Sequence, residues 1–232
     1  MAKTVTITAQ DGGTFSAYVA GDTNIAKGGP GILVIQEIFG VNQVMRDICD
    51  DLAAQGYVAL CPDLFWRQEP GVDITDKSKE HWDKAFALFG GFNLDLGITD
   101  LKSSLDALRK MTGGKVGTVG YCLGGKLAFL MAARSDVDAA VSYYGVGLAE
   151  HTGEVANIKK PLLMHVATED KFVPKDQQAK VKAAVAGNSN VTLHEYQGND
   201  HAFARVGGEH YDKDAAFAAN TRTANFFKSH LS

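Results

Sequence analysis

The stretch VGTVGYCLGGKLAFL, residues 116–130, decides the fold of this chain of 232 residues. A run rich in β-branched residues enters a glycine-rich turn, and an Ala/Leu-rich segment typical of a helix leaves it. From Gly120 to Gly124 the pattern is G-x-C-x-G, with Cys122 at the apex of the turn. This pattern is typical of the sharp strand-to-helix turn that presents a nucleophile, with sulfur in place of a hydroxyl. The stretch therefore predicts a strand, an outward-pointing thiol and a helix, in that order.

Small residues beside Cys122 are a physical requirement of such a turn. The strand and helix backbones approach each other closely there, so side chains at positions 120 and 124 would clash. The partial positive charge at the N-terminus of the helix favours a thiolate or a developing oxyanion at the same place. The turn therefore combines an accessible sulfur with an environment that stabilises negative charge.

Two other interpretations use the same letters. Gly120 to Lys126 also spells GxxxxGK, most of a phosphate-binding loop, but Leu127 stands where that motif needs Ser or Thr to hold magnesium. Cys122 can also be a small buried apolar residue, as free cysteines often are. The pentapeptide alone leaves open the choice between a buried thiol and a nucleophile.

Short apolar runs and amphipathic segments alternate on both sides of this turn, after an opening hairpin around Asp11-Gly12. The pattern predicts strands at 4–8, 15–20, 31–36, 57–65, 116–121, 137–145, 161–168 and 191–196. It predicts helices at 42–56, 79–89, 93–112 and 124–135, one from about 174 and a last one from about 211. Alternating strands and helices with short connections indicate an α/β fold with helices on both faces of the sheet. With no linker or repeat in the sequence, we expect a single domain over residues 1–232.

The composition limits the classes of partner. A content of 45% hydrophobic residues is sufficient for one well-buried core. The formal net charge of −4 argues against binding to nucleic acid or to an anionic membrane, which requires clustered Lys and Arg. A small-molecule ligand is the expectation that remains, and we expect a monomer.

Three cysteines, Cys49, Cys61 and Cys122, stand far apart without a CxxC pair, so no zinc site or dithiol centre is expected. No metal or organic cofactor is implied. Free thiols fit a reducing compartment. The N-terminal residues form no apolar signal region, and no later run approaches the length needed to cross a bilayer. We therefore expect a cytoplasmic protein.

The partners of Cys122 favour the nucleophile. In hydrolases with this turn, the acid and the histidine follow the nucleophile in that order. Asp170 stands just after the buried run PLLMHVAT, and His201 stands in the polar loop after the next strand. Glu169 and Asp200 compete for the role of acid, but immediate neighbours on a turn seldom reach each other's ring nitrogen, so Asp170 is favoured over Asp200. The other histidines fit the base less well, being within strand patterns (His165, His194) or at expected surface positions (His81, His151, His210, His230).

Several motifs in order resemble one known family. They are QEIFGVN at 36–42, GY at 56–57 followed by CPDL at 61–64, GYCLGG at 120–125, YYGVGL at 143–148, DKFVP at 170–174 and HAFAR at 201–205. The sequence resembles the dienelactone hydrolases, also called carboxymethylenebutenolidases, of the α/β-hydrolase superfamily. The resemblance covers nearly the whole chain and implies the α/β-hydrolase fold, with a mostly parallel, twisted central sheet.

The resemblance also implies the roles of individual residues. It gives a Cys122, His201, Asp170 triad and an oxyanion hole formed by the backbone N–H groups of Leu123 and Ile38. Glu37 and Arg205 are implied as a carboxylate and a cation of the same site, and four aromatic residues are implied to line its apolar part: Phe39, Phe89, Tyr144 and Phe203.

Glu37 is implied to interact with the resting thiol and to be displaced by substrate, so that the thiolate forms only with ligand bound. A carboxylate near a thiol disfavours a second negative charge. Without the resemblance, Glu37 can also be a solvated residue at a strand end. Arg205 matches the arginine that binds the substrate carboxylate, a task for which its planar fork is suited. A second family arginine, expected before the helix at 79–89, has no counterpart in this sequence. Either Lys79 or His81 substitutes for it, or the anionic pocket is built differently.

The sequence thus predicts a carboxylic ester hydrolase that opens a carboxylate-bearing enol lactone by cysteine nucleophilic catalysis through a thioester. A carboxylesterase or thioesterase on the same scaffold is the alternative, and a non-catalytic protein that binds a small ligand is a further one.

Overall fold

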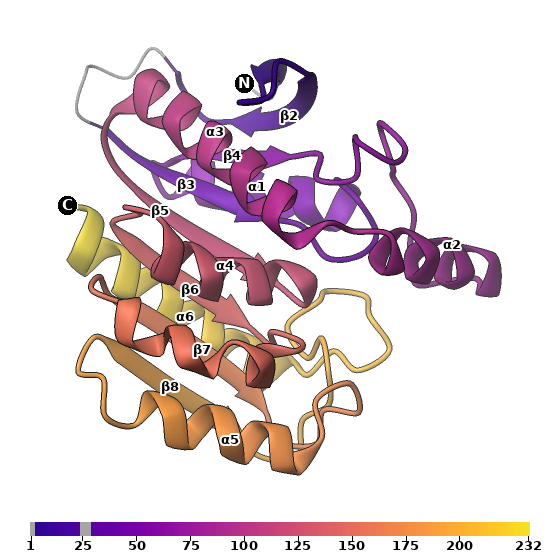
Figure 1. Cartoon of the computed structure of the whole chain (residues 1–232), viewed down its shortest axis with the longest axis vertical. Helices are drawn as coiled ribbons and strands as arrows, with labels where there is room; N and C mark the ends of the chain where they lie inside the picture. The colour runs from indigo at the N-terminus through magenta and orange to yellow at the C-terminus, as the bar shows by residue number, and fades with distance from the viewer. Residues whose placement is uncertain (1–2, 24–28) are drawn as a thin grey trace. The chain divides into compact units, whose positions relative to one another are not determined.

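The computed structural model describes residues 3–23 and 29–232. The chain divides into two compact units, Met1–Val116 and Gly117–Ser232, and each is described by itself below (Figure 1). In the described part of the chain, no helix is both long enough and apolar enough to span a membrane. The expectation of a single domain stays a prediction.

The first unit contains an opening hairpin, two further strands and three helices. They are β1 (Lys3–Thr8), β2 (Thr14–Ala20), β3 (Gly29–Ile35), α1 (Gln43–Ala54), β4 (Val58–Pro62), α2 (Lys79–Gly90) and α3 (Leu94–Thr112). β1 pairs antiparallel with β2, β2 pairs antiparallel with β4, and β4 pairs parallel with β3. Asn42, Ser78 and Asn93 cap the three helices by accepting a backbone N–H in the first turn. These elements agree with the ones predicted from the sequence.

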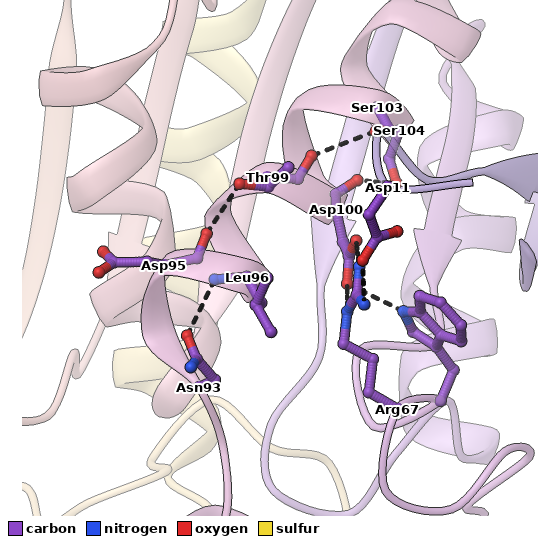
Figure 2. A network of polar contacts seen from close by, with 10 residues as sticks. Asp11, Arg67, Asn93, Asp95, Leu96, Thr99, Asp100, Ser103 and Ser104 are labelled. Atoms are coloured by element: carbon purple, nitrogen blue, oxygen red, sulfur yellow. Dashed lines mark hydrogen bonds and ion pairs between the residues drawn. The ribbon is translucent and has the colours of Figure 1, made fainter. Parts of the chain in front are cut away.

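A buried ion pair joins three segments of the first unit, and Figure 2 shows its side chains converging. Asp100 of α3 is only 1% exposed and accepts two hydrogen bonds from Arg67, at 2.9 and 2.8 Å, in a bidentate pair. The Trp66 indole donates to the same carboxylate at 2.9 Å, and Arg67 also reaches Asp11 of the hairpin turn at 2.6 Å. These four residues, the Arg67 cluster, tie the hairpin and the loop after β4 to α3.

The second unit is built on parallel strands. Its elements are β5 (Gly113–Tyr121), whose paired residues 117–121 belong to this unit, α4 (Leu123–Arg134), β6 (Ala139–Tyr143), two 3₁₀ turns (Leu148–Glu150 and Thr152–Asn157), β7 (Leu162–Ala167), α5 (Lys175–Val185), β8 (Val191–Tyr196) and α6 (Lys213–Leu231). The pairing order is β5-β6-β7-β8, parallel throughout. In the view of Figure 1, α4 and α5 lie in front of these strands and α6 lies behind them.

Helices on both faces explain why the central strands read as continuous apolar runs. Every residue of β6 is buried, and so is every residue of β4 in the first unit. The prediction of an α/β fold is confirmed. The two 3₁₀ turns were not predicted, because such short turns leave no periodic pattern. The last helix begins at Lys213, capped by Asp212, rather than at Tyr211.

Candidate active site

The turn at Cys122 joins the end of β5 to the first residue of α4. Cys122 has φ 57° and ψ −115°, a backbone conformation that costs free energy for a residue with a side chain. Its N–H donates to the Tyr143 carbonyl at 3.1 Å, and its own carbonyl accepts from Lys126 N–H at 3.1 Å. The backbone on both sides therefore holds the strained residue in place.

Glycines make the turn sterically possible. A Cβ atom on Gly120 would lie 1.9 Å from the carbonyl oxygen of Gly124, and one on Gly125 would lie 2.4 Å from the carbonyl oxygen of Tyr143. Both contacts are with backbone atoms, which cannot move aside as a flexible side chain can. The close approach of strand and helix expected from the sequence is thus present.

Cys122 differs from the other two cysteines in its exposure. Cys49 and Cys61 are buried, whereas Cys122 is partly exposed at the start of α4. Its position does not fit the interpretation of this residue as a small buried apolar side chain.

The structure brings His201 and Asp170 together from two loops. His201 Nδ1 lies 2.8 Å from Asp170 Oδ2, and both residues are buried, at 5% and 7% exposure. The other carboxylate oxygen of Asp170 accepts the Phe172 N–H at 2.8 Å, which fixes the orientation of the acid. Asp170 follows β7 and His201 follows β8, so the parallel strands bring the two loops to the same edge.

The two competing carboxylates have other partners. Glu169 pairs with Lys175 at 2.7 Å. Asp200 pairs with Lys171 at 2.8 Å and accepts the backbone N–H groups of Lys171 and His201, at 3.0 and 2.7 Å. Asp200 thus holds the loop that carries the histidine and does not contact its ring.

The environment of His201 favours its charged form. Burial lowers the pKa of the imidazole, but the neighbouring Cys122 sulfur and the Asp170 carboxylate outweigh that effect and raise the pKa to about 10. The side chain also hydrogen-bonds to Cys122. Because Nδ1 is directed at Asp170, Nε2 is the nitrogen that remains for the sulfur. The three side chains form a thiol, imidazole and carboxylate in series, which can carry out nucleophilic catalysis.

Comparison with known proteins points to one family. A model of the dienelactone hydrolase family matches residues 15–231. The chain belongs to the dienelactone hydrolase family. It is therefore a hydrolase of ester or lactone bonds, as the sequence predicted.

Individual relatives agree with this family. The chain is 58% identical over 98% of both chains to a protein of Azospirillum brasilense named "Putative carboxymethylenebutenolidase". It is 39% identical to the carboxymethylenebutenolidase of Pseudomonas putida, over 96% of this chain and 94% of that one. Among solved structures, the "Putative Dienelactone Hydrolase" of Klebsiella pneumoniae superposes with a TM-score of 0.88 at 26% identity, covering 99% of each chain. The prediction of an α/β-hydrolase fold is thereby confirmed.

Aromatic rings surround His201 in this dienelactone hydrolase family member. Tyr144, at 2% exposure and with φ 37°, packs edge-on against the imidazole with ring centres 5.1 Å apart. Phe203 is completely buried and stacks on Tyr196, so it packs within the interior of this unit. Arg205 is half-buried, and its backbone N–H donates to the Ala202 carbonyl at 2.9 Å. The contacts predicted between substrate and Tyr144, Phe203 or Arg205 stay predictions.

One aromatic residue beside His201, Phe172, is not among those predicted from the sequence. Phe172 is 48% exposed, yet its ring lies edge-on to His201 with centres 4.9 Å apart. The signal was available, because Phe172 stands two residues after the acid in the motif DKFVP, and its own N–H orients that acid.

The remaining predicted site residues belong to the first unit. Glu37 is the second residue after the end of β3 and is 2% exposed, which excludes its interpretation as a solvated strand-end residue. Ile38 and Phe39 are buried, and Phe39 packs edge-on against Trp82. Phe89 lies near the end of α2 and is 38% exposed. The contacts of these residues with substrate or with the triad stay predictions.

The two candidates for the missing arginine differ in their surroundings. The side chain of Lys79 is 87% exposed and pairs with Asp83 at 2.6 Å. His81 lies in the first turn of α2, and its Nδ1 accepts the Thr75 N–H at 3.2 Å. A ring nitrogen that accepts carries no proton, so neutral His81 bears its hydrogen on Nε2. His81 is therefore an oriented hydrogen-bond donor, whereas Lys79 is a solvated cation.

No metal-binding group is found within residues 3–23 and 29–232, where no three or more His, Cys, Asp or Glu side chains are placed to hold a metal ion.

Proposed function

We propose that the protein opens a carboxylate-bearing enol lactone by attack of the Cys122 sulfur on the lactone carbonyl. The observation that carries this proposal is the placement of His201 between Asp170, at 2.8 Å, and the Cys122 thiol. The carboxymethylenebutenolidase name of the 39% identical relative supports the choice of a lactone. A thiolate is both a good nucleophile and a good leaving group, so it suits esters with a stable leaving group such as an enolate.

The first chemical step forms a C–S bond to the carbonyl carbon and breaks the ring C–O bond. His201 accepts the thiol proton, and the Asp170 carboxylate stabilises the imidazolium that results. The enolate leaves and takes the proton that the His201 imidazolium holds, which gives the ketone and returns His201 to its neutral form. Water then attacks the thioester with His201 as base, which releases the second carboxylate and restores Cys122.

An oxyanion forms at the carbonyl oxygen during both steps. We assign its stabilisation to the backbone N–H groups of Leu123, at the start of α4, and of Ile38. One such donor is worth roughly 3 kcal/mol of transition-state stabilisation. The dipole of α4, whose first residue follows the nucleophile, acts in the same direction.

Substrate binding is assigned to Arg205, whose guanidinium can donate hydrogen bonds to both oxygens of the substrate carboxylate. His81 is the favoured replacement for the second arginine of the family, because it presents an oriented Nε2 donor. Glu37 is assigned to the resting thiol, from which the substrate displaces it. Phe39, Phe89, Tyr144 and Phe203 are assigned to the apolar part of the site, to which we add Phe172.

We also propose that the protein acts as a monomer on a small lactone or ester in the cytoplasm. One chain supplies all three residues of the triad, and its cysteines are free thiols, which persist in a reducing compartment.

The test follows the ring opening of dienelactone by ultraviolet absorbance, with the parent protein and the Cys122→Ala variant in parallel. The parent is expected to consume the lactone, and the variant to lose at least about 10⁴-fold in kcat, as nucleophile removal does in triad hydrolases. Comparable rates in both proteins would exclude the thiol as nucleophile.

A second comparison separates the lactonase from a general carboxylesterase. Arg205→Ala is expected to raise KM for the anionic lactone about tenfold or more and to leave an uncharged ester almost unaffected. An equal loss on both substrates would contradict a carboxylate-binding role for Arg205.

A further inference from the structure

A series of polar side chains in the second unit takes no part in the chemistry proposed above. It joins α6 to the last residues of β6 and β8 and to the interior of β7. From the surface inward, Arg222 Nη1 lies 2.9 Å from Tyr196 Oη, which lies 2.8 Å from His165 Nδ1. On the other side of the imidazole, His165 Nε2 lies 3.0 Å from Thr223 Oγ1. Thr223 Oγ1 lies 2.7 Å from Tyr143 Oη, which lies 3.0 Å from Asn220 Oδ1. These six residues are called the α6 chain below.

One direction of the first bonds of the α6 chain gives every hydrogen an acceptor within the chain. A guanidinium has no acceptor, so Arg222 donates and the Tyr196 oxygen accepts. The Tyr196 hydroxyl hydrogen then has His165 Nδ1 as its acceptor, whereas a hydrogen on Nδ1 would leave the hydroxyl hydrogen without an acceptor in the chain. Nδ1 is therefore the acceptor nitrogen, and His165 carries its hydrogen on Nε2.

The same reasoning fixes the remaining bonds. His165 Nε2–H donates to Thr223, and the Thr223 hydroxyl hydrogen is directed at the Tyr143 oxygen. Tyr143 then donates to Asn220 Oδ1, a carbonyl oxygen that can only accept. The chain begins at a group without an acceptor and ends at an atom without a hydrogen. Every donor and acceptor along its interior part is satisfied in one orientation.

The central residue of the α6 chain stays uncharged at neutral pH. His165 is 1% exposed, and its burial, together with the charges of His194 and Arg222, lowers the pKa of the imidazole to about 3. The neutral ring has one donor and one acceptor, which is what the chain requires.

The main-chain carbonyls of two members of the α6 chain, Tyr143 and His165, hold the backbone of the nucleophile and of Tyr144. The carbonyl of Tyr143 accepts the Cys122 N–H at 3.1 Å. The carbonyl of His165 accepts the N–H of Tyr144 at 2.8 Å, and the Tyr144 ring packs against His201. Two members of the chain are therefore one backbone hydrogen bond away from the nucleophile and from the residue that packs on the base.

The acid and the histidine loop are held by the third strand end. The carbonyl of Tyr196 accepts both the N–H and the hydroxyl of Thr168, at 3.1 and 3.2 Å, and Thr168 leads into the loop of Asp170. The Tyr196 ring stacks on Phe203, two residues after His201. Each of the three strands that bear the α6 chain thus holds a different part of the triad through one main-chain carbonyl.

We propose that Arg222 and Thr223 of α6 are positioning residues of the triad, acting through the single orientation of the hydrogen bonds that pass through His165. This inference rests on the proposed function only in that the positioned groups are Cys122, His201 and Asp170. Displacement of reacting groups by a fraction of an ångström lowers kcat, whereas substrate affinity depends on other residues.

The test compares Thr223→Val, which keeps the shape and removes the hydroxyl, with Thr223→Ser, which keeps the hydroxyl. Thr221→Val, at an exposed position on the same helix, is the matched control. With dienelactone as substrate, Thr223→Val is expected to lower kcat about tenfold or more with KM within about twofold, while Thr223→Ser stays within about threefold of the parent. Thr221→Val is expected to retain the parent kcat. A folded Thr223→Val variant with the parent kcat would overturn the inference, and so would equal losses in the Ser and Val variants.

A second measurement does not depend on turnover. Nitrogen NMR of labelled histidine reports which ring nitrogen of His165 carries the hydrogen. The parent and the Arg222→Lys variant are expected to show the Nε2–H form of His165 alone. The Arg222→Met variant is expected to show both tautomers of His165, because methionine cannot donate a hydrogen bond to Tyr196 at the surface end of the α6 chain. A single Nε2–H form in Arg222→Met would show that Arg222 does not set the direction and would overturn the inference. Failure of the proposed function appears separately, as activity retained in Cys122→Ala.

Discussion

The Arg67 cluster of the first unit and the α6 chain of the second both keep polar groups away from water, but they use opposite electrostatics. The carboxylate of Asp100, at 1% exposure, faces a bidentate guanidinium and an indole N–H, so a positive charge lies directly against it. His165, also at 1% exposure, stays neutral, and its charged partner lies two hydrogen bonds away at the surface end of the chain.

The two arrangements are suited to different tasks. Removing one member of a buried ion pair leaves an uncompensated charge, so the pair is costly to break even where desolvation offsets most of its net contribution to stability. A neutral chain of hydrogen bonds contributes less free energy for each bond, yet it fixes the direction of every hydrogen along its length. The ion pair joins segments of the scaffold, and the neutral chain lies under the strand ends that carry the triad.

The largest expected effect on stability comes from the backbone of the turn that carries Cys122, between β5 and α4. Gly120→Ala would place a Cβ 1.9 Å from a backbone oxygen, so the strand and helix must separate. We expect a loss of at least about 4 kcal/mol in the free energy of unfolding, measured by chemical denaturation. Gly187→Ala is the control, since its Cβ meets nothing within 4 Å. A loss below about 1 kcal/mol for Gly120→Ala would show that the turn is not closely packed.

The Arg67 cluster provides the next largest effect. Asp100→Ala removes both bonds of the bidentate pair and the acceptor of the Trp66 indole, and we expect a loss of about 3 kcal/mol in the free energy of unfolding. Asp11→Ala, which removes the partner at the exposed end, is the matched comparison and should leave the denaturation midpoint almost unchanged. Equal losses in the two variants would mean that burial of Asp100 is not what makes the pair strong.

Local patterns were sufficient to predict most of the fold and the order of the triad. The N-cap residue Asn42 and the hairpin turn at Gly12 are both short-range signals, and both lie where the sequence predicts them. Asp170 and His201 could be assigned because parallel strands bring their carboxyl ends to one edge, which is a rule of topology and needs no coordinates.

Long-range polar contacts could not be predicted in this way. His165 was expected to be a packed or exposed residue within a strand, and its partners Tyr196 and Thr223 are 31 and 58 residues away in sequence. Arg67 and Asp100 likewise stand 33 residues apart. Nothing in the spacing of such residues distinguishes a hydrogen-bonded pair from two side chains in solvent.

The neutral state of His165 gives the third effect, a dependence of stability on acid. Its folded pKa of about 3 lies below the unfolded value of 6.5, so the unfolded chain binds an additional proton between these values. The contribution is fully present above pH 6.5 and is lost as the pH falls towards 3, by about 1.4 kcal/mol for each pH unit. His165→Gln, which cannot titrate but keeps an acceptor and a donor, should unfold with a shallower acid dependence. Denaturation at several pH values checks this, and parallel curves for the two proteins would contradict it.

The smallest effect separates backbone strain from lack of space. Gly12, in the hairpin turn, has φ 92°, but a Cβ there would meet nothing within 4 Å. Gly12→Ala should therefore lose only about 1 kcal/mol in the free energy of unfolding, and Gly12→Asn less, because asparagine tolerates positive φ better. Gly90→Ala, an open position without a positive φ, is the control, and it should lose none. Gly120 has no positive φ, so its loss reports lack of space alone, whereas the loss at Gly12 reports backbone strain alone. If Gly12→Ala were as damaging as Gly120→Ala, positive φ in the hairpin turn would cost as much as a Cβ placed against a backbone oxygen, which contradicts the expected order.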